Sequence, residues 1–342
     1  MQNSKRVGML DIGIVGAGLM GCWHANSARR VGAHIRAIAD TNITVSKHLA
    51  GKYPGAKYFS NAEQMMKEVN LDVLHICTPL ETHVPIAELA MNAGIHVVIE
   101  KPVAPSVVET ELILKKAASR SLLVCAVHQF IFQEGVQKAK KSLAQIGKLL
   151  HVRSTICSAG AEGYSERKQD MIAADILPHP LSLMQYFIPC GISDKDWVIV
   201  MSKHGEFHAF YTLDEITASV FISMNTRPTE CTLQILGSEG RITLDLFHGY
   251  AYIESGKVSR MRKIAHPFSL SASIFINAAL NLGRRIVHRE LAYPGLTPLI
   301  GAFYRAVQTH SDCPISSNDL LTVALVRDKL IQSAGLDKLL VQ

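Results

Sequence analysis

The chain has no Cys-x-x-Cys pair, no long uninterrupted apolar run and few aromatic residues, and each shortage excludes a class of protein. Its seven cysteines are scattered along the sequence, so we expect reduced and mostly buried thiols rather than a disulfide framework. No window has the roughly 18 consecutive apolar residues of a membrane-spanning helix. Aromatic residues, 6% of the chain, do not alternate with its basic residues as a nucleic-acid stacking surface requires. We therefore expect neither nucleic acid nor membrane as a partner.

Length and composition favour a globular enzyme. With 342 residues, of which 48% are hydrophobic, the chain is long enough for two domains with cores of their own. The polar and basic start is followed by an apolar run that contains Asp11, which is typical of a first strand and not of a secretory signal. We predict a cytoplasmic protein. The net charge of +6 is compatible with a solvated basic surface or with attraction of an anionic ligand.

Three spaced glycines after an apolar run form the most informative motif. The predicted strand Leu10–Val15 leads into Gly-x-Gly-x-x-Gly, and a predicted helix over Met20–Val31 follows. In this pattern the first glycine permits a tight turn, the second lets a phosphate approach the backbone, and the third lets the helix pack on its strand. An ordinary glycine-rich turn is the alternative. We predict a dinucleotide site that includes Gly16, Ala17, Gly18, Leu19, Met20 and Gly21.

An acidic residue follows the second predicted strand. Asp40 comes directly after His34–Ala39, about two dozen residues beyond the glycines, where a carboxylate accepts hydrogen bonds from the adenosine ribose hydroxyls. A carboxylate there also repels a 2′-phosphate, which favours NAD over NADP. The neighbouring Thr41 and Asn42 leave NADP open.

Short apolar runs alternate with helical patterns from residue 10 to about 127, which is typical of a doubly wound parallel sheet of the Rossmann type. Ser60 with Glu63, and Ser106 with Glu109, have the spacing of helix capping boxes. The predicted strands are Leu10–Val15, His34–Ala39, Lys57–Phe59, Val73–Cys77, His96–Ile99 and Leu122–Ala126.

The pattern changes after residue 128. One helix is predicted over 133–146, and consecutive strand patterns follow with few helices between them, which favours an open, mainly antiparallel sheet. Helical patterns over 274–287, 299–309 and 317–334 close the chain. We therefore predict an α/β fold with a Rossmann dinucleotide-binding domain at 1–127 and an α+β domain for substrate binding and oligomerisation at 128–342. The predicted strands are 148–157, 197–203, 206–213, 216–224, 231–237, 241–246 and 250–254.

Polar residues at the carboxyl ends of the parallel strands are the first candidates for a site, because ligands of doubly wound sheets bind beyond those ends. Three groups qualify, one after each of the fourth, fifth and sixth strands. We predict that their members contact the cofactor: Thr78, Pro79 and His83; Glu100 and Lys101; and His128. A segment of the second domain must cover the cofactor, and the best candidate is Asp175-Ile-Leu-Pro-His-Pro180.

These motifs, in this order, resemble the Gfo/Idh/MocA oxidoreductases. The resemblance rests on the glycine motif, the Cys77-Thr78-Pro79 turn with His83, the Glu100-Lys101-Pro102 tripeptide, and Asp175 with His179. It implies an NAD(P)-dependent dehydrogenase that acts on a secondary alcohol or ketone of a sugar, a sugar derivative, in some cases nucleotide-linked, or a cyclitol. It also implies a homo-oligomer, dimer or tetramer, formed sheet to sheet.

The resemblance implies roles for single residues as well. Lys101 is expected to be catalytic or to bind substrate, His179 to be the catalytic acid/base, and Asp175 to support it. Acid–base chemistry agrees with this, because oxidising an alcohol requires a group that takes the hydroxyl proton and histidine titrates near neutral pH. We predict that Tyr164 and Arg167 join these three residues around the substrate.

Proline residues flank His179, and this affects the expected local structure. A residue before proline avoids helical backbone angles, so we expect the helix to begin at Pro180, with His179 near its cap. Apolar residues alternate with others over 216–224 and 231–236, which is compatible with burial of both sheet faces, one of them by another subunit.

Two other function classes remain open. The fold serves as a non-catalytic NAD(P)-binding sensor in a galactose-pathway co-repressor of the same family, and an imine or pyrrole reductase can be built on the same first domain. The presence of both Lys101 and His179 argues against the sensor. We predict no metal site, since hydride transfer to an alcohol carbon proceeds without a metal.

Overall fold

The computed structural model describes residues 9–256, 260–288, 290 and 292–336, which form two compact units. Unit 1 comprises Met1–Val127 and Leu296–Ala324, and unit 2 comprises His128–Gly295 and Leu325–Gln342. The segment 296–324, which the sequence analysis placed in the second domain, lies in unit 1 because the buried face of its helix packs against the first helix of the chain. Within the described ranges, no helix has the length and apolarity needed to cross a membrane.

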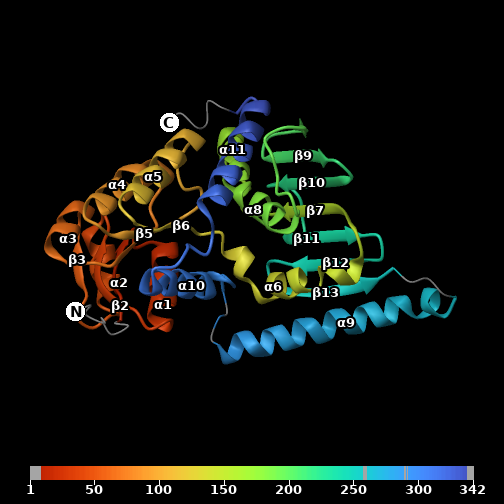
Figure 1. Ribbon diagram of the computed structural model, residues 1–342, viewed down its shortest axis with the longest axis horizontal. Coiled ribbons are helices and arrows are strands. Elements are labelled where there is room, and N and C mark those ends of the chain that lie inside the picture. Colours follow the sequence, from red (N-terminus) through yellow and green to blue (C-terminus); the bar gives the residue numbers. More distant parts are fainter. Residues whose placement is uncertain (1–8, 257–259, 289, 291, 337–342) are drawn as a thin grey trace. The chain divides into compact units, whose positions relative to one another are not determined.

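Unit 1 is built on a six-stranded parallel sheet, as predicted (Figure 1). The strand order is β3-β2-β1-β4-β5-β6. β1 pairs with both β2 and β4, so the strand order reverses between β1 and β4. Crevices for ligands open at this reversal in doubly wound sheets. The strands are β1 (Asp11–Val15), β2 (His34–Ala39), β3 (Lys57–Phe59), β4 (Val73–Ile76), β5 (His96–Ile99) and β6 (Val124–Ala126).

Helices follow each strand of unit 1. α4 packs beside both α3 and α5, whereas α1 packs against α10. Ser106 caps α5 as predicted, since its hydroxyl accepts from Glu109 N. The predicted cap at Ser60 is wrong by one residue, because Asn61 accepts from Gln64 N and begins α3. The helices are α1 (Leu19–Arg30), α2 (Ile43–Ala50), α3 (Ala62–Glu68), η1 (Leu80–Thr82), α4 (His83–Asn92), α5 (Val107–Ser119) and α10 (Leu296–Thr309).

Unit 2 is built on a seven-stranded sheet in the order β13-β12-β11-β7-β10-β9-β8. The pair β7 and β10 is parallel and the other neighbours are antiparallel, which confirms the mainly antiparallel sheet. The strands are β7 (Leu149–Cys157), β8 (Trp197–Val200), β9 (Glu206–Leu213), β10 (Ile216–Ser223), β11 (Glu230–Gly237), β12 (Gly240–Asp245) and β13 (Tyr250–Ser255).

One face of the second sheet is buried and the other is open. Val152, Val220 and Leu233 lie on the buried face, where α6 covers β12 and β13 and α7 covers β9 and β10. Val198 on the edge strand β8 and Phe210 on its neighbour β9 are 62% and 49% exposed. Burial of both faces, which the sequence suggested, is therefore not reached within this chain.

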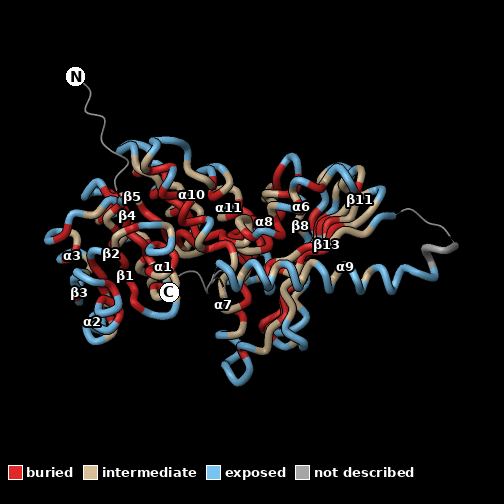
Figure 2. Tube along the Cα trace, turned by 90° about the horizontal axis from the view of Figure 1, so that it is seen from below, coloured by how far each residue is buried: buried red, intermediate tan, exposed pale blue. Residues whose placement is uncertain are grey.

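The helices of unit 2 depart most from the sequence analysis. The helix predicted over 133–146 is divided at Ser142 into α6 and η3. The helix predicted over 274–287 begins at Arg260, passes through Pro267, and has no buried residue in its described part (Figure 2). The helices are η2 (Gln129–Phe132), α6 (Glu134–Lys141), η3 (Leu143–Ile146), α7 (Glu166–Ile176), α8 (Pro178–Phe187), α9 (Arg260–Val287) and α11 (Ser317–Ser333), the last of which begins in unit 1.

Candidate functional site

The three glycines of the first loop have separate structural roles. Gly16 has a φ of +89°, and a Cβ there would lie 2.4 Å from the Cys77 carbonyl oxygen. A Cβ on Gly21 would lie 1.9 Å from the Gly16 carbonyl oxygen, so only glycine lets α1 approach β1 so closely. A Cβ on Gly18 meets no described atom within 4 Å. Gly16 and Gly21 are therefore required by the fold, while Gly18 borders open space in front of α1.

The start of α1 is suited to an anion. Gly18 is its N-cap, no side chain in the described part of the chain caps it, and its first turn has no acidic residue. Uncapped N–H groups and the helix dipole together favour a phosphate at such a place. This fits the pyrophosphate of a dinucleotide, on the open side of Gly18.

Asp40 is held firmly beside the glycine loop. Its carboxylate accepts from Ala17 N at 2.8 Å through Oδ2 and from Asn42 N at 2.9 Å through Oδ1. Each oxygen keeps a further lone pair for a hydroxyl donor. Asn42 caps α2 through Thr44 N, so its side chain is already engaged.

The residues after β4 and β5 are tied together by a buried histidine. His83 is 1% exposed, and its ring nitrogens lie 2.9 Å from the Thr78 carbonyl oxygen and 3.0 Å from the Pro102 carbonyl oxygen. A neutral imidazole donates to only one of these two acceptors at a time. The Lys101–Pro102 peptide is cis. His83 therefore links the Thr78-Pro79 turn to the Glu100-Lys101-Pro102 tripeptide.

Glu100 precedes Lys101 and is nearly buried. Burial opposes ionisation of this carboxyl, but its hydrogen bond with His24, the charges of His24 and Lys101, and the Lys101 backbone N–H lower its pKa below the usual value. Its Oε2 accepts from Lys101 N at 3.2 Å. A carboxylate is thus fixed at the residue before the candidate lysine.

A histidine pair that the sequence analysis did not identify lies behind Glu100. His24 on α1 and His75 on β4 are fully buried, with their Nδ1 atoms 2.8 Å apart. His24 Nε2 lies 3.1 Å from Glu100 Oε1, and His75 Nε2 lies 2.7 Å from the hydroxyl of Tyr304 on α10. The helical spacing of His24 after the glycines was visible in the sequence, but Tyr304 is 229 residues from His75.

In unit 2, Asp175 and His179 lie on either side of a helix junction. α7 ends at Ile176 and α8 begins at Pro178, so the predicted start at Pro180 is wrong. The prolines are tolerated because first-turn N–H groups have no acceptor within a helix. Leu177 between them keeps right-handed helical angles. Asp175 and His179 are therefore four residues apart along nearly continuous helical backbone.

The imidazole of His179 is supported by an aromatic ring. It stacks on Phe130 of η2, with ring centroids 4.5 Å apart and an angle of 26°. His128, two residues before Phe130, is 4% exposed. Stacking restricts the rotation of His179 and leaves its ring edge, which bears the nitrogens, to face other groups.

Asp175 faces a buried arginine that the sequence analysis missed. Arg327 on α11 is 2% exposed and lies 3.1 Å from the Asp328 carboxylate. Burial lowers the pKa of its guanidinium, and the charges of Asp328 and Asp175 oppose this. Arg327 therefore provides a fixed positive charge near Asp175. Nothing in the local sequence distinguishes it from a surface arginine.

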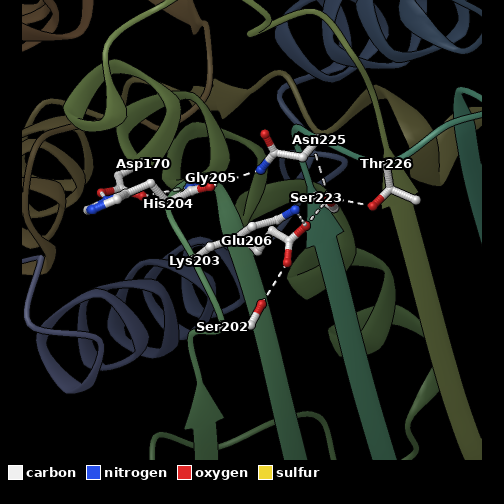
Figure 3. Close-up of polar contacts among 9 residues, drawn as sticks. All are labelled: Asp170, Ser202, Lys203, His204, Gly205, Glu206, Ser223, Asn225 and Thr226. Atoms are coloured by element: carbon white, nitrogen blue, oxygen red, sulfur yellow. Dashed lines mark hydrogen bonds and ion pairs between the residues drawn. The ribbon is translucent and has the colours of Figure 1, made fainter.

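The first half of α7 is anchored by a second acidic residue, Asp170, which is 3% exposed (Figure 3). Its Oδ1 accepts from Gly205 N at 2.7 Å, and its Oδ2 lies 2.7 Å from His204 Nδ1. This hydrogen bond and the charge of Asp170 raise the pKa of His204. The anchor fastens α7, which carries Asp175, to the turn before β9.

Next to this anchor, Glu206 accepts hydroxyl hydrogen bonds from both Ser202, at 2.6 Å, and Ser223, at 2.7 Å (Figure 3). These bonds join the start of β9 to the end of β10. The remaining predicted substrate residues, Tyr164 and Arg167, lie at exposed positions around the start of α7. The structure thus assembles the candidate residues in two groups, one per unit, and the predicted meeting of Lys101 with His179 stays a prediction.

Comparison with known proteins assigns the first part of the chain to a family. Residues 10–128 match the model of an oxidoreductase family with an NAD-binding Rossmann fold. Residues 10–128 belong to the Gfo/Idh/MocA oxidoreductase family. The match includes the glycine loop, Asp40, His83, Lys101 and His128, and it confirms the resemblance inferred from the sequence.

Curated relatives match this chain over part of its length. Inositol 2-dehydrogenase of Corynebacterium glutamicum (strain R) is 35% identical over 98 residues, which are 28% of this chain and 29% of that protein. The scyllo-inositol 2-dehydrogenase (NADP(+)) IolU of Bacillus subtilis (strain 168) is 24% identical over 64% of this chain and 70% of that protein. With several curated relatives, the match spans only about a third of their length, from 29% to 36%.

Solved structures extend the likeness to both units. Levoglucosan dehydrogenase, solved with NADH and levoglucosan, has a TM-score of 0.78 at 21% identity and covers 96% of this chain and 98% of that one. At this identity the likeness establishes the fold. A Rossmann unit followed by a mainly antiparallel sheet is therefore a fold that this chain shares with that structure over nearly its whole length.

Proposed function

We propose that this protein is an NAD(P)-dependent oxidoreductase that transfers a hydride between a nicotinamide and a CH–OH group of a sugar, sugar derivative or cyclitol. The observation that carries the proposal is the loop at Gly18, where open space meets an uncapped helix N-terminus beside a fixed carboxylate. That combination suits the pyrophosphate and ribose of a dinucleotide.

The cofactor is held mainly by residues of unit 1 in this proposal. The N–H groups at the start of α1 bind the pyrophosphate, and Asp40 accepts from the adenosine ribose. Gly16, Ala17, Leu19, Met20 and Gly21 shape the loop around it. Thr78, Pro79, His83, Glu100, Lys101 and His128 line the nicotinamide half. When bound, the nicotinamide supplies the hydride acceptor or donor.

The substrate is handled by acid–base side chains. His179 takes the hydroxyl proton during oxidation and returns it during reduction, because its imidazole exchanges a proton near neutral pH. Lys101 donates a hydrogen bond to the same oxygen and stabilises its developing negative charge. Asp175 orients substrate hydroxyls and is itself held by the charge of Arg327. Tyr164 and Arg167 complete the substrate contacts from the start of α7.

Relatives support the substrate class. The proteins that match include inositol 2-dehydrogenases, a UDP-N-acetylglucosamine 3-dehydrogenase and levoglucosan dehydrogenase. The substrates after which these proteins are named are polyhydroxylated rings, some of them nucleotide-linked. Neither a sensor nor an imine reductase is favoured by any observation on this chain.

A substrate panel tests the proposal. The full chain is incubated with NAD or NADP and with inositols, free hexoses, anhydrosugars and UDP-sugars, and nicotinamide absorbance is followed. We expect reduction of the cofactor with at least one ring polyol. Cofactor binding without turnover on any alcohol or ketone, together with reduction of a cyclic imine, would contradict it.

Asp40 is expected to set the cofactor preference for NAD. Replacing Asp40 by serine removes the charge that repels a 2′-phosphate, so we expect the ratio of kcat/KM for NAD over NADP to fall by at least about 10-fold, as loss of roughly 1.4 kcal/mol of discrimination implies. Steady-state rates with each cofactor measure the kcat/KM ratio, and direct titration of both cofactors measures the difference in binding. Asp72→Ser, at the opposite end of the strands, is the control, and a preference for NADP in the unchanged protein would contradict our interpretation of Asp40.

We further propose a homo-oligomer, dimer or tetramer, that pairs through the open face of the second sheet. Exposed Val198, Val200 and Phe210 on β8 and β9 support this, since apolar groups that cluster on one sheet face favour association. Light scattering at micromolar concentration is expected to give a multiple of the chain mass. Phe210→Asp should lower that mass, and a monomer in the unchanged protein would refute the proposal.

A cytoplasmic location is also proposed. All seven cysteines lie in the described part of the chain and are free thiols, as in a reducing compartment.

A further inference from the structure

A buried chain of four side chains runs through unit 1 from Glu100 to Tyr304. It passes from the carboxylate to His24 at 3.1 Å, from His24 to His75 at 2.8 Å, and from His75 to the Tyr304 hydroxyl at 2.7 Å. The two imidazoles are fully buried and Tyr304 is 4% exposed. Four elements of unit 1 contribute: α1, β4, α10 and the end of β5.

The chemistry of the groups permits one direction of donation when both histidines are neutral. A carboxylate only accepts, so His24 Nε2 carries the hydrogen and its Nδ1 accepts. His75 Nδ1 must then donate, its Nε2 accepts, and the Tyr304 hydroxyl donates. Donation thus runs from Tyr304 through both imidazoles to Glu100, and every polar atom along it has a partner.

The pKa shifts of His75 and Tyr304 agree with that arrangement. Burial, with a smaller contribution from His24, lowers the pKa of His75 well below its usual value, which keeps that ring neutral. Burial also raises the pKa of Tyr304 well above its usual value, so the hydroxyl keeps its proton. The pKa of Glu100 is lowered, despite burial, by His24 and Lys101. Cys77 beside Glu100 is a protonated thiol, because burial raises its pKa well above its usual value.

We propose that His24, His75 and Tyr304 are positioning residues, which fix the Glu100 carboxylate and through it the orientation of Lys101. Glu100 has one oxygen on His24 and the other on the Lys101 backbone N–H, so both ends of the carboxylate are held. Rotation of Glu100 would release that N–H and place a movable negative charge next to the lysine. This inference rests on the proposed role of Lys101 in the reaction.

Two replacements of His24 separate its two hydrogen bonds. In His24→Gln the amide nitrogen takes the place of Nε2 and still donates to Glu100, whereas in His24→Asn the amide takes the place of Nδ1 and loses Glu100. Losing this donor raises the pKa of Glu100. If the reaction needs the ionised carboxylate, activity then begins to fall at a higher pH as the solution is acidified. In the reduction direction, where His179 has to be protonated and so sets the basic limb, we expect His24→Asn to move the acid limb of kcat/KM upward by about one pH unit. His24→Gln should restore most of its position.

Tyr304→Phe removes the first donor of the chain while keeping the ring that packs there. We expect a smaller shift in the same direction, with an unchanged Kd for NADH. His48→Asn, at an exposed position on α2, is the control for a histidine replacement in the same unit. Superimposable pH profiles for the unchanged protein, His24→Asn and His24→Gln would overturn the proposal.

A second measurement does not depend on activity. In the full chain labelled with ¹⁵N-histidine, long-range ¹⁵N–¹H spectra report which ring nitrogen carries hydrogen. We expect hydrogen on Nδ1 of His75 and on Nε2 of His24, although free imidazole prefers Nε2–H. The reverse tautomer at His75 would overturn the chain. If the tautomers are as expected but the protein is inactive on the whole substrate panel, the proposed function is refuted and the buried chain of hydrogen bonds is not.

Discussion

Replacement of His179 by alanine is expected to lower kcat by about 10²–10⁴, the usual contribution of a positioned proton-transfer group. The dissociation constant for NADH should stay unchanged, because in the proposed mechanism the imidazole acts on the substrate oxygen and unit 1 holds most of the cofactor. Stopped-flow or steady-state absorbance at saturating substrate measures kcat, and fluorescence titration measures NADH binding. The two values together separate a chemical role from a binding role.

Controls for this experiment come from the surroundings of His179. His288→Ala, at an exposed position just beyond α9, should leave kcat unchanged. Phe130→Leu removes the stacking ring while keeping the histidine, so kcat should fall by less than in His179→Ala. If His179→Ala retained more than a tenth of the original kcat, another group would have to exchange the proton.

Replacement of Gly18 by valine is expected to abolish useful cofactor affinity without unfolding the protein. A Cβ at this position meets no described atom within 4 Å, and the backbone there is extended, so the fold accommodates the side chain. The same side chain would occupy the space in front of the uncapped start of α1. We expect the Kd for NADH to rise at least about 100-fold, or about 2.7 kcal/mol.

Two other glycines show whether the effect is specific. Gly283→Ala on α9 likewise meets no described atom within 4 Å and should leave both Kd and thermal stability unchanged or slightly improved. Gly21→Ala places a Cβ 1.9 Å from the Gly16 carbonyl oxygen, so the melting temperature itself should fall. Titration calorimetry gives the Kd of each variant, and differential scanning calorimetry gives its melting temperature. Tight NADH binding by Gly18→Val would exclude the loop as the pyrophosphate site.

Local patterns were sufficient to predict the strands, because each depends on a short run of apolar residues between turns. β2, β3, β5 and β9 match their predicted ranges, and the other strands differ by a few residues at their ends. Ser106 caps α5 because both partners of a capping box lie within one turn. Two predicted helix starts were wrong. The cap expected at Ser60 is Asn61, and the helix expected to begin at Pro180 begins at Pro178.

The length of α9 was not predictable from periodicity. Its first half includes Pro267 and several serines, which individually disfavour a helix, and no described residue of the helix is buried. Contacts with β13 and hydrogen bonds such as that from Asn281 to the His248 carbonyl oxygen hold it instead. Such contacts are made with other elements of unit 2, and the periodicity of the helix itself does not reveal them.

The sequence by itself determined the dinucleotide loop, Asp40 and the order of the two sheets, since these follow from residue type and short spacing. Tertiary structure alone decided that His24, His75, Glu100 and Tyr304 form one buried chain, and that Arg327 lies near Asp175. The reason is physical: hydrogen bonds and charge interactions depend on distances in space. The strand reversal between β1 and β4 and the return of α10 set those distances for the buried chain, and the second half of α11 sets them for Arg327 in unit 2.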